Sequence, residues 1–301
     1  MSRNFLTFAD VSRQDIERLF DMSRRYKARR RLGEAGRVLD GRRVGLFFRK
    51  PSTRTRVSFE VAVLELGGQP IYLSGDMTQV SRGEEIKDTA CVLSRYLDGL
   101  VVRTFAHKEL EEFARWASVP VVNALTDFAH PCQALADYFT ILEKRGSLSG
   151  LVLAYVGDAN NVCNSLIEAA CLLGVSIRVA SPPEFGVAAD VAARGRAAGV
   201  LTVTEDPAEA VEGAHVVYTD TWVSMGDEAQ RDRRLKAFSP YQVNSALLAR
   251  ADRDVLFMHC LPAHRGQEVT SEVLDGTHSV VFDQAENRLH CQKALLDFLY
   301  S

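Results

Sequence analysis

The sequence predicts an α/β protein with two domains, each a mainly parallel sheet flanked by helices. Short, almost wholly apolar runs alternate with helical patterns along the 301-residue chain. Such runs are typical of strands that helices cover on both faces of a parallel sheet. Four of them precede the polar, glycine-containing segment EKRGSLSG at 143–150, and four follow it. We therefore expect one domain over about 1–140 and a second over 150–285, with a linker between them.

The expected strands carry β-branched or large apolar residues at most positions. In chain order they are VGLFF (44–48), PIYL (70–73), GLVV (99–102), VPVVN (119–123), LVLAYV (151–156), SIRVA (176–180), HVVYT (215–219) and VLFMH (255–259). Helical patterns lie between most of them. RTRVSFEVAVLELGG and NSLIEAACLLG both end on glycine, which is favoured just past a helix. DPAEAVEG places proline just inside a helix start and glycine past its end.

The last stretch of the chain, ENRLHCQKALLDFLY, repeats apolar residues at helical spacing. It predicts a C-terminal helix over about 286–301. Periodicity leaves open which domain receives this helix, and our expectation is that it packs back on the first one.

The composition excludes several classes of protein. The formal net charge of −3 favours neither a nucleic acid nor an anionic membrane as partner. The basic run RRYKARRR at 24–31 has no aromatic platform beside it, so a solvated helix face is favoured over a nucleic-acid patch. No apolar run approaches the roughly 18 residues of a membrane span. The start, MSRNFLTFADVSRQD, lacks the apolar segment of a signal peptide, and we expect a cytoplasmic protein whose six cysteines are reduced thiols.

Polar clusters follow most of the expected strands. In parallel sheets, ligand-binding groups gather past the carboxyl ends of the strands. The clusters are RKPSTRTR, Arg103, HPCQ (130–133), GDANN (157–161), DTWVSMG (220–226) and CLPAHRG (260–266). Their positions predict binding sites at these strand ends.

The first cluster predicts an anion site at a helix start. Pro51 fixes the backbone before the helix, and Ser52 or Thr53 is a favoured N-cap. The amides of a helix's first turn bind anions, and an arginine fork matches phosphate oxygens. Arg54 and Arg56 lie about 200° apart on a helix, so we assign the anion to Arg54, nearer the start. The alternative is a capped surface helix with solvated arginines.

Two further clusters offer groups for a polar substrate. His130 and Gln133 open a helix, and both side chains have donors for a carbonyl oxygen, although a lone histidine is more often structural. DTWVSMG has the carboxylate of Asp220, the hydroxyl of Ser224 and apolar neighbours, which suits a small amine with an aliphatic stem; a capped loop is the alternative. GDANN lacks the GxGxxG pattern of dinucleotide loops, so a nucleotide site is disfavoured.

One hypothesis for Cys260 is that its thiol acts as a covalent nucleophile. Covalent catalysis needs a histidine side chain that meets the thiol. His259 precedes Cys260 on an expected strand and should point to the opposite face. His264 is not excluded by that argument. We do not expect Cys260 to act as a covalent nucleophile.

Taken together, six motifs resemble the aspartate/ornithine transcarbamoylase family, over essentially the whole chain. In order they are STRTRVSFE, TQVSRGEEIKDTA with Gln79, HPCQALAD, GDANN, DTWVSMG and HCLPAHRG. The last two favour the ornithine-using members. The resemblance implies transfer of a carbamoyl group from carbamoyl phosphate to the side-chain amine of L-ornithine, giving L-citrulline and phosphate. It also implies a homotrimer or multiple of trimers, with neither a metal nor an organic cofactor.

The resemblance also implies residue roles. The carbamoyl phosphate set is Ser52, Thr53, Arg54, Thr55, Gln79, Arg103, His130, Gln133, Cys260, Leu261 and Arg288. The ornithine set is Asn161, Asp220, Ser224 and Met225, and the catalytic set is Arg54, Arg103, His130 and Cys260. In this family the loop of Gln79 reaches the neighbouring subunit's site.

Alternatives and departures remain at this stage. Other acceptors are an N-acylated ornithine, putrescine or aspartate, although aspartate-using members carry a lysine in a mobile loop where this chain has Arg82 and Lys87 beside Gln79. A non-catalytic anion-binding module with the same fold is a second alternative. Arg49 and Gln267 stand where the ornithine-using members commonly have glutamate. The residues serve arginine biosynthesis and citrulline or arginine breakdown equally.

Overall fold

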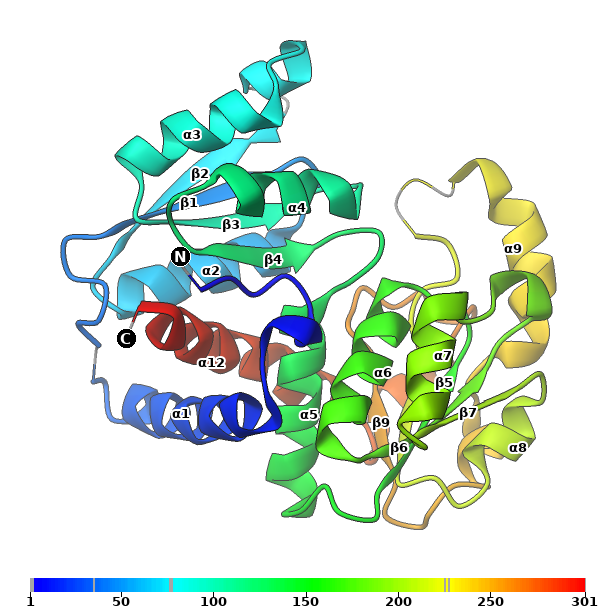
Figure 1. Cartoon of the computed structure of the whole chain (residues 1–301). Coiled ribbons are helices and arrows are strands. Elements are labelled where there is room, and N and C mark those ends of the chain that lie inside the picture. The colour runs from blue at the N-terminus through cyan, green and yellow to red at the C-terminus, as the bar shows by residue number, and fades with distance from the viewer. Residues whose placement is uncertain (1–2, 35, 76–77, 225, 227, 301) are drawn as a thin grey trace. The chain divides into compact units, whose positions relative to one another are not determined.

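The computed structural model describes residues 3–34, 36–75, 78–224, 226 and 228–300 (Figure 1). The chain divides into two compact units, Met1–Phe139 with Glu286–Ser301, and Thr140–Ala285. Each unit contains one parallel sheet, of four strands in the first and five in the second, flanked by helices. The predicted fold class is therefore confirmed.

The first unit is built on a sheet with the strand order β2-β1-β3-β4. Its strands are β1 (Arg43–Phe48), β2 (Gln69–Ser74), β3 (Gly99–Arg103) and β4 (Val121–Leu125). Its helices are α1 (Arg13–Arg31), α2 (Thr53–Glu65), α3 (Ile86–Tyr96) and α4 (His107–Trp116), with short 3-10 turns η1 (Phe8–Asp10) and η3 (Gln79–Arg82). Helix α5 (Pro131–Arg145) starts in this unit, and α12 (Val281–Tyr300) ends in it.

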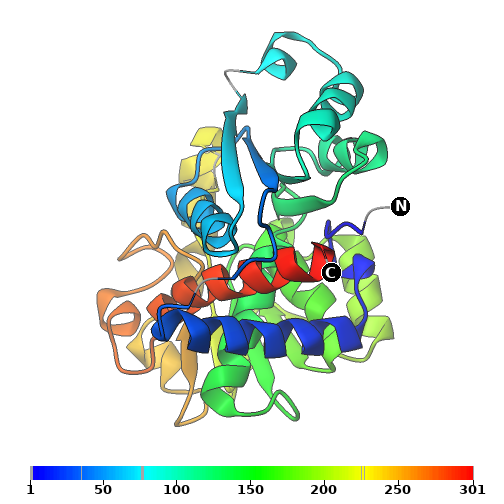
Figure 2. The same ribbon diagram turned by 90° about the vertical axis from the view of Figure 1, so that its left-hand side faces the viewer.

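Helices cover both faces of this sheet. Figure 1 shows α3 and α4 on one face, where Leu110 and Phe113 of α4 pack with Phe47, Leu100 and Val102 of the strands. Helices α2 and α12 lie on the other face, and α1 runs beside α12 (Figure 2). The last strand starts two residues later than expected because Pro120 has no N–H to donate to a ladder.

The contact between α1 and α12 corrects one expectation. Lys27 belongs to the basic run at 24–31, yet its side chain is buried and its Nζ donates to Asn287 Oδ1 at 2.8 Å. Arg24, Arg29 and Arg30 do form ion pairs at exposed or partly exposed positions. The run is therefore a solvated face with one buried cation, and not a wholly solvated one.

The second unit has the strand order β7-β6-β5-β8-β9. Its strands are β5 (Val152–Val156), β6 (Ser176–Ala180), β7 (Leu201–Thr204), β8 (Val216–Tyr218) and β9 (Leu256–Met258). Its helices are α6 (Asn161–Leu173), α7 (Ala189–Ala197), α8 (Pro207–Val211), α9 (Arg231–Phe238), α10 (Ser245–Leu248) and α11 (Ser271–Leu274), with 3-10 turns η4 (Pro183–Phe185), η5 (Glu228–Gln230) and η6 (Ser239–Tyr241).

Two features of this unit differ from expectation. Strand β7 was not predicted, because it is an edge strand in which Thr202 and Val203 are exposed and only Leu201 is buried. An edge strand needs no continuous apolar run. The expected linker at 143–150 begins within α5, whose last turn includes Lys144 and Arg145. Within the described residues, no helix is both long and apolar enough to cross a membrane.

Candidate active site

Both sheets reverse their strand order at one point. Four of the six predicted polar clusters follow the strands beside these reversals, while HPCQ (130–133) follows β4 and CLPAHRG (260–266) follows β9. In the first unit the chain passes from β1 outward to β2 and then to β3 on the other side of β1. In the second it passes from β5 through β6 and β7, and then to β8 on the other side of β5. Open parallel sheets bind ligands outside the carboxyl ends of the strands at such reversals. The loops after β1 and β3, and those after β5 and β8, are therefore the candidate sites.

We call the residues at the first reversal the phosphate cluster. They are Ser52, Thr55, Arg103, His130, Gln133 and Arg288, and all belong to the first unit. Ser52 is the N-cap of α2, and its side chain accepts a hydrogen bond from the backbone N–H of Thr55 at 3.3 Å. This cap points the amides of the first helical turn outward beside the end of β1. The helix start thus has the donors and partial positive charge that bind an anion.

Two buried arginines add positive charge to this cluster. Arg103 is the last residue of β3 and is 5% exposed, and Arg288 on α12 is 4% exposed. The guanidinium of Arg288 donates to the side-chain oxygen of Thr55 at 2.8 Å, which joins α12 to the first turn of α2. Arg103 is paired with Phe48 across the ladder, so its side chain starts from the level of the α2 loop. Two arginines held this way suit a ligand with more than one negative charge.

His130 is a neutral imidazole in this setting. Burial is the main cause that lowers its pKa well below 6.5, and the positive charges of Arg288 and Arg103 lower it further. A neutral imidazole donates one hydrogen bond without carrying charge, which suits a carbonyl oxygen.

The side-chain amide of Gln133 is oriented by a neighbour on the same helix. Its Nε2 donates to the carboxylate of Asp137 at 2.8 Å, one turn further along α5. Among the described residues its buried Oε1 has no hydrogen-bond partner. The Oε1 is therefore an acceptor that suits an N–H of a ligand. The contact with Asp137 uses one of the two N–H groups of Nε2, so the predicted donation to a carbonyl oxygen stays a prediction.

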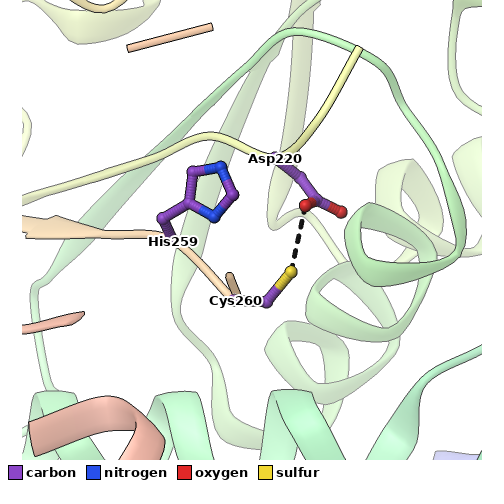
Figure 3. Close-up of side chains that lie close together, drawn as sticks. All are labelled: Asp220, His259 and Cys260. Atoms are coloured by element: carbon purple, nitrogen blue, oxygen red, sulfur yellow. Dashed lines mark hydrogen bonds between the residues drawn. The ribbon is translucent and has the colours of Figure 1, made fainter. Parts of the chain in front are cut away.

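The second reversal gathers a smaller acceptor cluster, consisting of Asn160, Asp220, Thr221 and Cys260. Figure 3 draws Asp220 and Cys260 of this cluster. Asp220 is 5% exposed, and its Oδ2 accepts from the side chain of Asn160 at 2.8 Å. Its Oδ1 accepts from the backbone N–H of Thr221 at 2.8 Å and from the thiol of Cys260 at 3.0 Å. All three donors are neutral, and among the described residues no lysine or arginine forms an ion pair with Asp220.

His259 does not point away from Cys260 as predicted. Strand β9 ends at Met258, so the alternation of strand side chains no longer applies at 259–260. One ligand atom each of Asp220, His259 and Cys260 lies within 4.8 Å of the others, and Figure 3 shows the three side chains gathered. Both ring nitrogens of His259 nevertheless have protein partners, the N–H of Leu261 and the carboxylate of Glu268. A metal at this point would have to displace one of them.

Other predicted residues are placed by the elements that contain them. Thr53 and Arg54 are exposed in the first turn of α2, and Gln79 is exposed in η3. Asn161 is the first residue of α6 and is half-buried, as is Ser224 in the loop after β8. Met225 lies outside the described residues.

Two functional candidates were missed by sequence reasoning. Asn160, and not Asn161, bonds Asp220, while its Oδ1 caps α6 by accepting from Val162 and Cys163. Its position before a helix was the available signal, because asparagine is a favoured N-cap. Arg234 is buried and donates to the carbonyl of Trp222 and the carboxylate of Asp158, which ties together the loops after β8 and β5. Its basic surroundings in RDRRLKAF gave no signal of burial.

The departure at Arg49 is accommodated locally. Its guanidinium forms an ion pair with Glu109, which also accepts from the hydroxyl of Thr104. The positive charge next to the phosphate cluster is therefore compensated. Gln267 contributes its backbone carbonyl to a bond from Gln242 at 2.8 Å.

Comparisons with known proteins agree with this geometry. Residues 3–143 match the family model "Aspartate/ornithine carbamoyltransferase, carbamoyl-P binding domain", and residues 149–299 match "Aspartate/ornithine carbamoyltransferase, Asp/Orn binding domain". The ornithine carbamoyltransferase of Carboxydothermus hydrogenoformans is 50% identical over 302 residues, covering 99% of this chain and 97% of that protein. The ornithine carbamoyltransferase of Methanoculleus marisnigri is 52% identical over 297 residues, covering 98% and 96%.

Solved structures show the same similarity. The ornithine carbamoyltransferase from Pyrococcus furiosus superposes with a TM-score of 0.94 at 47% identity, covering 98% of this chain and 96% of that one. The enzyme of the same name from Thermus thermophilus has a TM-score of 0.91 at 42% identity and full coverage of both chains. Sequence, fold and the two polar clusters thus lead to one conclusion: the chain belongs to the aspartate/ornithine carbamoyltransferase family.

Proposed function

We propose that this protein transfers the carbamoyl group of carbamoyl phosphate to the side-chain amine of L-ornithine, giving L-citrulline and phosphate. The observation that carries the choice of acceptor is the buried carboxylate of Asp220, which has only neutral donors around it. A buried carboxylate without a cation is unfavourable, and the α-ammonium group of ornithine would compensate it. The relatives named ornithine carbamoyltransferase support the same acceptor.

Other acceptors fit this carboxylate less well. Aspartate has an α-ammonium group but would bring a second carboxylate towards Asp220. Putrescine has no carboxylate to use the donors expected from Asn161, and an N-acylated ornithine has no α-ammonium charge. The buried anion therefore favours free ornithine among the four.

The phosphate cluster supports the donor half of the reaction. We assign the phosphate to Ser52, Thr53, Arg54 and Thr55 at the start of α2, and to the buried guanidinium groups of Arg103 and Arg288. The carbonyl oxygen of carbamoyl phosphate accepts from the neutral imidazole of His130. The carbamoyl N–H donates to the Oε1 of Gln133, a buried acceptor that has no hydrogen-bond partner among the described residues.

The reaction requires a neutral amine. A lysine-like amine with a pKa near 10.4 is neutral in only about one molecule in 2,500 at pH 7, a deficit of about 4.6 kcal/mol. The neutral nitrogen attacks the carbonyl carbon to form a tetrahedral intermediate. The carbon–oxygen bond to phosphate then breaks with its electron pair on the phosphate oxygen, and the amine's extra proton leaves with the phosphate. Alignment of the two reactants supplies roughly 7–11 kcal/mol of the barrier.

The remaining roles follow from this scheme. Arg54 and Arg103 stabilise charge on the departing phosphate, and His130 polarises the carbonyl. Cys260 orients the reacting amine without forming a covalent bond, and Leu261 contributes to the carbamoyl phosphate set. Asn161, Ser224 and Met225 hold the amino acid. No step needs a metal or an organic cofactor.

We also propose a cytoplasmic homotrimer, or a multiple of trimers, in which Gln79 serves a neighbouring subunit. Exposed apolar side chains on α2 and the edge strand β2 support self-association, since Val57 is 49%, Leu64 58% and Ile71 37% exposed. Arginine biosynthesis and the breakdown of citrulline or arginine both use this reaction.

Citrulline formation tests the proposal directly. The purified protein is incubated with carbamoyl phosphate and ornithine, with aspartate, putrescine and N-acetylornithine as parallel acceptors. Citrulline from ornithine and no product from the others is the expected result. Product from another acceptor would show that only the assignment of the acceptor cluster to ornithine is wrong. Folded protein that binds phosphate but carbamoylates none of the four would be a non-catalytic anion-binding module.

A further inference from the structure

The turn that carries Cys260 has an unfavourable backbone. Leu261 has φ 59, and it is the non-glycine residue with positive φ within the described part of the chain. A side chain with a Cβ rarely adopts this left-handed conformation, which persists only where surrounding groups hold it. Since Cys260 and Leu261 both belong to the proposed site, what holds this residue also sets the geometry of the site.

His259 makes the bond that holds it. The backbone N–H of Leu261 donates to His259 Nδ1 at 2.9 Å, and the histidine side chain is fully buried. A ring nitrogen that accepts a hydrogen bond has no proton of its own, so Nδ1 is the unprotonated nitrogen of a neutral imidazole. The proton must then be on Nε2.

Glu268 selects that arrangement of the proton. His259 Nε2 lies 3.2 Å from Oε1 of Glu268, which is also fully buried, and a carboxylate can only accept. The same oxygen accepts from the backbone N–H of His264, and the backbone N–H of His259 donates to Gln284 Oε1 at 3.0 Å. The imidazole is thus fixed in position and in tautomer from both sides.

We propose that His259 is a positioning residue for carbamoyl transfer: with its tautomer set by Glu268, it holds the Leu261 backbone so that Cys260 and Leu261 present a fixed surface to the reacting amine. This inference rests on the proposed function. It assigns no contact with substrate to His259. Glu268 acts only through His259, whose tautomer it sets.

Two substitutions remove the two hydrogen bonds of the His259 ring one at a time. The side-chain oxygen of asparagine takes the place of Nδ1, so His259→Asn keeps the acceptor for Leu261 and loses the donor to Glu268. The side-chain amide of glutamine takes the place of Nε2, so His259→Gln keeps the donor to Glu268 and loses the acceptor for Leu261. We expect kcat with ornithine to fall by about a hundredfold in His259→Gln and far less in His259→Asn, with KM for carbamoyl phosphate little changed in both.

A second histidine provides a matched control. His215 Nδ1 accepts the backbone N–H of Val152 at 3.1 Å, which is the same kind of bond in the same unit. It lies at the start of β5 and β8, whereas the acceptor cluster follows the ends of these strands. His215→Gln should lower stability and leave kcat and KM of the folded protein unchanged. A kcat loss in this control as large as that of His259→Gln would mean that losing any such bond in this unit impairs catalysis. That result would overturn the proposal.

Amide hydrogen exchange at Leu261 gives a readout that does not depend on activity. The amide should be protected in the wild type and in His259→Asn, and should exchange faster in His259→Gln. Greater activity in His259→Gln than in His259→Asn, or faster exchange at Leu261 without a loss of kcat, would overturn the positioning role. If the wild type forms no citrulline, the proposed function fails and the positioning role fails with it, whereas citrulline from the wild type with equal kcat in the two variants rejects the positioning role alone.

Discussion

At the scale of single residues, Arg54 is the side chain whose role is easiest to separate from folding. It is exposed in the first turn of α2, so its removal should change the free energy of unfolding by no more than about 0.5 kcal/mol. If it binds the departing phosphate, Arg54→Ala should lower kcat by about 10²–10³-fold, as loss of a charge-stabilising donor does. Steady-state kinetics and urea unfolding measure the two effects.

Arg56→Ala is the control on the same helix. Arg56 pairs with Glu60 at 2.9 Å, and its guanidinium carbon lies 3.7 Å from the ring centroid of Tyr72. Since these contacts already engage the Arg56 side chain, the Arg56→Ala variant should keep most of the enzyme's activity. Equal kinetic losses in both variants, or an Arg54→Ala loss that follows the unfolded fraction, would make Arg54 an ordinary surface arginine.

His130 predicts a dependence of stability on pH. Its pKa is lowered in the folded protein, mainly by burial and then by Arg288 and Arg103, so below pH 6.5 the unfolded chain binds a proton that the folded one does not. Stability from this group is therefore present above pH 6.5 and is lost as the pH falls. The ordinary pKa of 6.5 limits this loss to at most about 2 kcal/mol at pH 5.

A variant isolates this contribution. Between pH 7 and pH 5, wild-type protein should lose more unfolding free energy than His130→Gln, by at most about 2 kcal/mol, and between pH 8 and pH 7 the two should change equally. Urea unfolding at the three values measures this. Parallel curves down to pH 5 would mean that the imidazole is protonated in the folded state, and a charged His130 would contradict its role as a neutral donor.

At the scale of elements, the start of α6 joins stability to substrate binding. Asn160 caps this helix and bonds Asp220 with the same side chain. Asn160→Ala should cost about 1 kcal/mol of stability for the cap. It should also lower kcat/KM for ornithine by about tenfold, because the carboxylate of Asp220 loses a neutral donor.

Asn244 provides the comparison within the same unit. It caps α10 by accepting from the N–H of Leu247 at 3.0 Å and has no described contact with Asp220. Asn244→Ala should lose similar stability and keep its kcat/KM for ornithine. If both alanine variants retain normal kinetics, the bond from Asn160 to Asp220 is not part of acceptor binding.

Elements were predictable wherever local patterns determine them. Buried strands can be predicted from apolar runs in the sequence. The loop of Ser52 follows one such run, so most of the phosphate cluster could be predicted. The edge strand β7 could not be predicted in this way, because a strand with exposed residues at the edge of a sheet needs no apolar run. Side-chain direction was harder to predict, because the end of β9 at Met258 brings the side chain of His259 near that of Cys260. The contact between Gln133 and Asp137 was predictable, since residues four apart on a helix are neighbours.

At the scale of the whole molecule, the proposed trimer makes a prediction about shared sites. If Gln79 serves the neighbouring subunit, Gln79→Ala and Arg54→Ala trimers should each be nearly inactive. Mixed and reassembled trimers contain sites in which the intact Arg54 of one subunit meets the intact Gln79 of another. Citrulline formation should therefore reappear on mixing, at a fraction of the wild-type rate.

Unmixed trimers of each variant, taken through the same dissociation and reassembly, are the control. Mass spectrometry of intact assemblies verifies that hybrids have formed. Hybrids that remain as inactive as their parents would place Gln79 in the site of its own subunit, or in none.

The bond between Arg288 and Thr55 spans 233 positions of the sequence. The whole segment from α2 to Arg288 must be synthesised before this cluster can be completed, because Arg288 lies on α12. A nascent chain can form the first sheet and the capped start of α2 and still lack one of the two buried arginines. If both arginines hold the proposed phosphate, a chain cut short before α12 should bind phosphate more weakly than the full chain, however well its earlier parts have folded.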